Sequence, residues 1–152
     1  METLHDLDQK TIDGIQDLIA INIDSEKGFA EAADKIENAR VASVFRDIGR
    51  ERANFATELQ GAVARSGDSP EESGSVKGTL HRWWLSLRGS IQDGEEKAVL
   101  DEAVRGEDAI VGKYEDVLPN VAGNPLNDML LKQYETVKSG RDALTDLRDS
   151  YK

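Results

Sequence analysis

Four polar side chains interrupt the apolar stripes of four helical segments in this sequence. They are Asn22, Glu51, Glu107 and Gln133, and each stands where the helical repeat places an inward-facing residue. Helices that direct carboxylates towards one bundle axis can build a site for two metal ions. The sequence therefore predicts that these side chains meet at the centre of a helical bundle, with Glu51 and Glu107 as its candidate metal ligands and Asn22 and Gln133 as their neighbours.

Two buried glutamates that face each other must be compensated. Burial and like charge would raise the pKa of at least one of Glu51 and Glu107. The compensation can be a shared proton, a bound metal ion, or a salt bridge to a cation such as Arg52, Lys113 or Lys138. We favour a proton-sharing or salt-bridged core pair over a metal. The inward-facing position rotates along a long helix, so Glu51 can fall at the edge of the core rather than at its centre.

The histidines of a di-iron site are missing. That site uses Glu-x-x-His on two of its helices. Asn54 stands three residues after Glu51, and Thr136 stands three residues after Gln133. Asn22 takes the position of a further expected glutamate. Two carboxylates and two amides would suit at most one weakly held divalent ion such as iron, manganese or zinc, so we expect no cofactor.

The elements that would position these residues are long helices. Apolar residues recur at the helical period over the segments 4–36, 38–66, 75–91, 95–118 and 125–150. Capping signals mark the segment ends: Thr3 with Asp6, Asn38, Gly67, Asp93 with Glu96, and Asn124 with Pro125. The pattern predicts an all-α fold in one domain over 1–152, a four-helix bundle made of two helical hairpins joined by a crossover helix.

Composition narrows the classes of function. The chain has 152 residues, no cysteine and a net charge of −11. Disulfides and cysteine nucleophiles are excluded, and an acidic exterior disfavours nucleic acid and anionic membranes. No apolar run approaches the roughly 20 residues of a membrane span, and the N-terminus lacks a signal segment. We expect a cytoplasmic protein that is not an enzyme, since no triad-like or phosphate-loop spacing occurs.

Trp83 and Trp84 are the second notable feature. Adjacent residues on a helix point about 100° apart, so both rings cannot face one core. Either one ring plugs the bundle while the other covers a hairpin, or the pair forms an interface with a partner. We expect self-association, with a dimer as the simplest form.

The stretches 18–29, 45–59, 74–83 and 106–114 together resemble a bacterial family of four-helix-bundle proteins of unknown function, placed in the ferritin-like superfamily. The resemblance implies a ferritin-like bundle. It also implies that Glu107 with Tyr114 forms a recurrent pair of the superfamily, and that Asn22 with Phe29 is its altered counterpart. The two hairpins would then be a divergent internal repeat.

Three functions are left open. The leading one is a non-enzymatic ferritin-like bundle with a degenerate di-metal site, for which the resemblance implies a stress-related role. The first alternative is a metal-binding or weak di-iron oxidase-type protein that uses Glu51 and Glu107. The second is a protein-interaction adaptor that uses Trp83 and Trp84 or the acidic faces.

Overall fold

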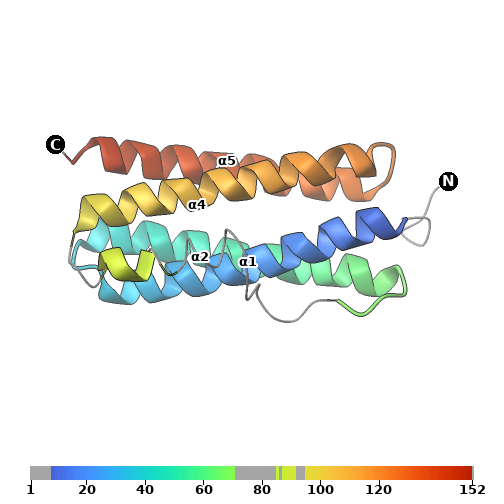
Figure 1. Cartoon of the computed structure of the whole chain (residues 1–152), viewed down its shortest axis with the longest axis horizontal. Helices are drawn as coiled ribbons and strands as arrows, with labels where there is room; N and C mark the ends of the chain where they lie inside the picture. Colours follow the sequence, from blue (N-terminus) through green and yellow to red (C-terminus); the bar gives the residue numbers. More distant parts are fainter. Residues whose placement is uncertain (1–7, 71–84, 86, 92–94, 152) are drawn as a thin grey trace.

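The computed structural model describes residues 8–70, 85, 87–91 and 95–151, and no strand occurs among them. The long elements are α1 (Gln9–Lys35), α2 (Ala39–Arg65), α4 (Glu96–Val117) and α5 (Leu126–Asp149), with a short 3₁₀ helix, η2 (Leu118–Val121), before α5. The all-helical fold predicted from the sequence is confirmed for this part of the chain (Figure 1).

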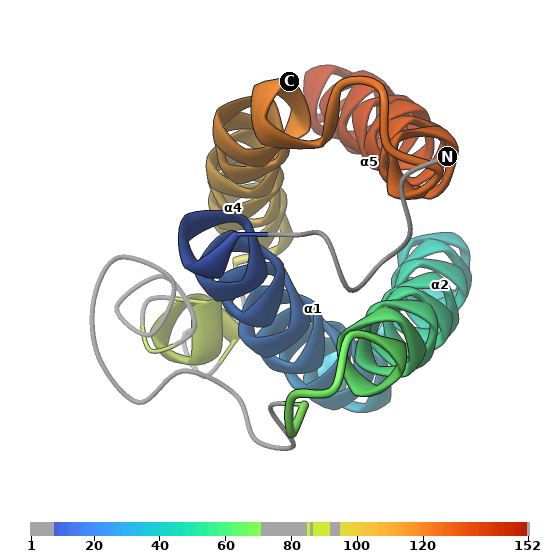
Figure 2. The same cartoon turned by 90° about the vertical axis from the view of Figure 1, so that its right-hand side faces the viewer.

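The four long helices form two antiparallel hairpins that share one core. α1 packs along α2, and α4 packs along α5. The hairpins lie side by side, so that α1 neighbours α4 and α2 neighbours α5 (Figure 2). α2 ends at one end of the bundle and α4 begins at the other (Figure 1). The connection over 66–95 therefore spans the length of the bundle.

The start of α1 differs from the prediction. Asp8 is its N-cap, and its carboxylate accepts a hydrogen bond from the Thr11 amide at 2.8 Å. An aspartate at this position satisfies an amide that the first helical turn leaves without a partner. The helix therefore begins at Gln9 rather than at residue 4. The predicted cap of Thr3 with Asp6 lies outside the described residues.

Both ends of α2 follow their predicted signals. The side chain of Asn38 accepts hydrogen bonds from the Arg40 and Val41 amides at 3.0 and 3.1 Å. At the other end Gly67 has a φ of +93°, a conformation that glycine adopts without the penalty of a Cβ atom. Ser66 and Gly67 therefore end the helix where the sequence places its terminus.

The ends of α4 and α5 are only partly as predicted. The N-cap of α5 is Pro125 rather than the predicted Asn124, and the helix begins at Leu126. Asn124 lies one residue earlier, and its Oδ1 still accepts from the Leu126 amide at 2.9 Å. Glu95 is the N-cap of α4, and its side chain makes no capping bond. Asp93, the predicted partner of Glu96 in a capping box, lies outside the described residues, and Glu96 is the first residue of the helix rather than the third after its cap. Its carboxylate instead accepts from the Asn38 amide at 3.1 Å and from the Tyr151 hydroxyl at 3.2 Å, and it ties three parts of the chain together.

The apolar core runs the length of the bundle. Phe29 of α1 and Phe45 of α2 pack edge to face with ring centroids 5.2 Å apart. The predicted crossover helix 75–91 lies mostly outside the described residues, but residues 85 and 87–91 are helical. Leu87 from this stretch is fully buried. Trp83 and Trp84 lie outside the described residues.

Candidate functional site

A buried ion pair lies between the hairpins. The side chains of Arg52 on α2 and Glu107 on α4 have no exposed surface, and Arg52 Nη2 donates to Glu107 Oε2. The backbone of α5 closes over this pair at Gly140. A Cβ atom there would stand 3.3 Å from Glu107 Oε2 and 3.6 Å from Arg52 Nη2. Elements from both hairpins therefore enclose one positive and one negative charge.

The prediction that Glu51 is buried opposite Glu107 is wrong. The Glu51 side chain is 44% exposed, and Arg52 occupies the inward position instead. The inward stripe of α2 runs from Ile48 to Arg52 and then Ala56, in steps of four residues. Steps of three and four both fit a helix, so the sequence pattern cannot fix which neighbour points inward. The predicted burial of Glu107 is confirmed, and its partner is Arg52.

Burial and pairing act against each other on the Glu107 carboxyl. Burial raises the pKa of Glu107 to about 7, while the charge and hydrogen bond of Arg52 oppose that rise. Glu51 stays within reach of the pair, since its Oε1 lies 3.8 Å from Arg52 Nη1. Partial burial raises the pKa of Glu51 as well. Two carboxyl groups thus share one guanidinium.

A chain of hydrogen bonds links all four long helices beside the ion pair. Asn22 Nδ2 on α1 donates to the Tyr114 hydroxyl of α4 at 3.0 Å. That hydroxyl donates to Gln133 Oε1 on α5 at 2.7 Å. Gln133 Nε2 then donates to Glu58 Oε1 on α2 at 3.1 Å. The predicted inward positions of Asn22 and Gln133 are therefore confirmed, with Gln133 level with Tyr114 rather than with Glu107.

Burial strongly disfavours ionisation of the Tyr114 hydroxyl. It raises the pKa of Tyr114 above the ordinary value for tyrosine, with Glu107 and Glu58 adding to the effect. The phenol therefore stays protonated and can both accept from Asn22 and donate to Gln133.

The predicted salt bridge from a buried glutamate to Arg52 is confirmed for Glu107, but sequence reasoning missed that Arg52 is itself a core residue. Its side chain is among the largest fully buried ones in the described part of the chain. The available signal was its spacing of four from both Ile48 and Ala56. Arginine and glutamate are both almost never fully buried without a partner, so residue type gave no reason to prefer Arg52 over Glu51. Glu58, which the sequence offers as a possible helper of Glu51 and Glu107 in a metal site, is exposed, yet its carboxylate reaches the cluster by accepting from Gln133 Nε2.

The acidic side chains at the centre are few. Within the described ranges, no group of three or more His, Asp or Glu side chains is placed to hold a metal ion. Asn54, at the position where a di-iron site carries histidine, is exposed. Arg52 already places a cation against the one fully buried carboxylate of the cluster.

The cluster is only partly hydrogen-bonded. Asn22 Oδ1, Glu107 Oε1 and two nitrogens of Arg52, Nε and Nη1, are buried without a hydrogen-bond partner among the described residues. Each such atom carries a desolvation cost that a hydrogen bond would offset.

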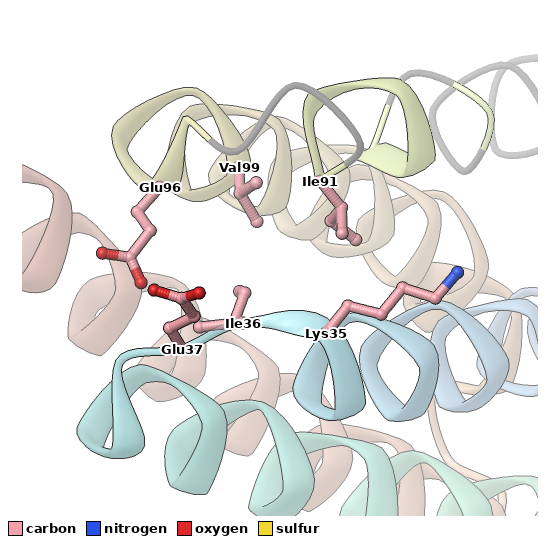
Figure 3. Close-up of a pocket in the computed structure, with 6 residues that line it drawn as sticks. All are labelled: Lys35, Ile36, Glu37, Ile91, Glu96 and Val99. Atoms are coloured by element: carbon pink, nitrogen blue, oxygen red, sulfur yellow. The ribbon is translucent and has the colours of Figure 1, made fainter.

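A separate groove of about 310 Å³ lies at one end of the bundle (Figure 3). It is lined by Lys35, Ile36, Glu37, Ile91, Glu96 and Val99. The carboxylates of Glu37 and Glu96 lie near each other, and Lys35 points away from them (Figure 3). Glu96 is already bound to Asn38 and Tyr151, so the groove offers little free polar chemistry.

Fold and cluster together define a helical-bundle protein with a buried polar centre. No helix in the described part is long and apolar enough to cross a membrane. The chain belongs to the family described as "Domain of unknown function (DUF2383)", whose model matches residues 10–120. That match includes α1, α2 and α4, and with them Asn22, Arg52 and Glu107. No curated protein matches the chain.

Proposed function

We propose that this protein is a non-enzymatic ferritin-like bundle in which an ion pair stands where a di-metal centre would lie. The observation that carries the proposal is the complete burial of Arg52 against Glu107. The arrangement of two hairpins, with a connection that spans the bundle and a polar cluster on its axis, supports the ferritin-like part.

Charge is the physical reason. Glu107 is the one fully buried carboxylate of the cluster, and Arg52 balances its charge. A divalent ion beside that guanidinium would face repulsion in a site of low dielectric constant. Glu51 could join Glu107 as a second metal ligand only if α2 rotated about its axis and carried the half-exposed Glu51 carboxylate inward. The metal-binding alternative therefore has less support than the ion pair.

The test is a metal-loading experiment on the full chain. Protein purified without chelator is incubated with Fe(II), Mn(II) or Zn(II) and desalted, and its metal content is measured by mass spectrometry. We expect far less than one ion per chain in wild type and in the Glu107→Gln variant. We also expect Fe(II) to oxidise no faster with the protein than with buffer.

Glu115→Gln is the matched control, because Glu115 lies on the same helix at an exposed position. About one ion per chain in wild type and in E115Q, lost in E107Q, would overturn the proposal. The same pattern would support the di-iron oxidase-type alternative.

The proposal also includes a cytoplasmic location, a stress-related role and self-association as a dimer. Light scattering on wild type and Trp83→Ala tests the dimer. A mass of two chains that falls to one in the variant is expected, and an unchanged mass contradicts an interface at that residue. Higher abundance of the protein after oxidative or acid stress in its natural host would support the stress role.

A further inference from the structure

We infer that the buried Arg52–Glu107 pair selects which hairpins dock together, so that α1–α2 accepts α4–α5 and rejects a second copy of itself. This goes beyond the proposed function, because it assigns a recognition surface between the two halves of the chain. It would hold for a bundle of any activity.

The polar groups are divided between the hairpins in a complementary way. The α1–α2 hairpin contributes Arg52, Asn22 and Glu58, and the α4–α5 hairpin contributes Glu107, Tyr114 and Gln133. Three direct contacts cross between them. They are the ion pair, the bond from Asn22 to Tyr114 at 3.0 Å, and the bond from Gln133 to Glu58 at 3.1 Å.

Docking of two identical hairpins would destroy this complementarity. Two α1–α2 hairpins would bury two Arg52 guanidinium groups whose remaining carboxylate neighbour is the half-exposed Glu51 of the same helix, and two α4–α5 hairpins would bury two Glu107 side chains without the Arg52 cation. An unpaired buried charge costs far more than a mismatched surface contact. Specificity between similar partners is commonly obtained by such a penalty on the wrong pairing.

The rest of the interface does not supply the same discrimination. Another charged contact between the hairpins, Lys113 with Asp17 at 3.3 Å, is partly exposed, with 35% and 60% of the side chains accessible. Solvent and salt screen such pairs. The buried apolar side chains of both hairpins are mainly aliphatic, and such surfaces discriminate weakly between similar shapes.

Charge reversal in the full chain tests the inference. Arg52→Glu and Glu107→Arg each place like charges at the contact within one chain, and each should lower the folding equilibrium constant about a hundredfold or more. Refolded together at equal concentrations, the two variants can exchange hairpins so that both contacts become complementary. We expect native mass spectrometry, with one variant isotopically labelled, to show mixed dimers well above the statistical half.

The double variant R52E/E107R keeps the test valid if the single variants fail to fold. It restores one charge of each sign at the contact, so we expect it to recover most of the lost folding equilibrium and to form no excess of dimer. The matched control is the mixture of Asp17→Lys with Lys113→Glu, which reverses the exposed pair and should give no enrichment of mixed dimers.

Two results would overturn the inference. One is a mixture of R52E with E107R that forms no more mixed dimer than the control mixture. The other is a double variant as unstable as the single variants, because the two positions would then not act as a charge pair.

Discussion

At the residue scale, the Glu107 carboxyl makes the free energy of unfolding depend on pH. Its pKa is about 7 in the folded chain, compared with an ordinary value of 4.5. Between these values the folded protein binds one more proton than the unfolded chain. The free energy of unfolding must therefore fall as the pH rises, with the stabilisation fully present below 4.5 and lost through pH 7.

We expect wild type to lose on the order of 3 kcal/mol between pH 4.5 and 8 relative to Glu107→Gln, which has no proton to release at this position. Urea unfolding at a series of pH values measures the difference. The groups that face Glu107 are Arg52 and Glu51 of α2 and Asp108 of its own helix. Curves for wild type and E107Q that run parallel would show that Arg52 holds the carboxyl ionised throughout.

The sequence was sufficient to place three of the four predicted polar residues inside the bundle. Asn22, Glu107 and Gln133 are buried. Each follows apolar residues at spacings of three and four, and Glu107 is also followed by apolar residues at both spacings. Glu51 and Arg52 are adjacent charged residues, and periodicity cannot choose between them. Arg52 points inward because Glu107 on the other hairpin offers it an opposite charge. Such a contact between distant parts of the chain cannot be read from the local sequence of α2.

At the element scale, close helix approach depends on small residues. A Cβ atom at Gly14 of α1 would stand 3.0 Å from Val117 Cγ2 of α4, which is closer than such contacts normally allow. Val117 is buried and β-branched, so its side chain has little freedom to turn away. Gly14 therefore sets how near α1 and α4 can lie.

Alanine at position 14 should therefore destabilise the protein. Alanine gains about 1 kcal/mol of helix propensity over glycine, but overpacking costs about 1–3 kcal/mol. We expect Gly14→Ala to lose up to about 2 kcal/mol in thermal or urea unfolding. The control is Gly112→Ala on α4, where no described atom lies within 4 Å of the added Cβ, and it should gain up to about 1 kcal/mol. Equal stability of the two variants would contradict a tight contact at Gly14.

At the helix ends, contacts between neighbours in the chain could be predicted from the sequence, whereas contacts between distant elements could not. Asn38, Gly67 and Asn124 act through their own neighbours in the chain, and the sequence identified each of them. Glu96 also carries a local capping signal, yet it binds Asn38 and Tyr151 from other elements. A local rule failed there because a distant donor was available and the start of α4 lies beside it.

At the scale of the whole molecule, stability and a unique arrangement are separate properties. The ion pair leaves buried atoms without hydrogen-bond partners, so an apolar pair of similar volume should pack at least as well. Replacement of buried ion pairs by apolar residues is often neutral or stabilising by about 1–4 kcal/mol. On the inference drawn above, the contribution of the pair lies in the wrong dockings that it excludes.

The double variant R52M/E107L separates these two properties. We expect its free energy of unfolding to equal or exceed that of wild type, whereas Arg52→Met alone should cost about 3–5 kcal/mol at pH 8, because the buried Glu107 then either stays charged without a cation or takes up a proton from a solution poor in protons. With no buried charge to reject identical hairpins, refolding of the double variant at high concentration should give a higher average mass than the dimer expected of wild type. Urea unfolding and light scattering on the same samples measure both effects. A double variant as unstable as R52M, or with the same average mass as wild type, would mean that packing around Gly140 and Ile48, rather than charge, fixes how the hairpins meet.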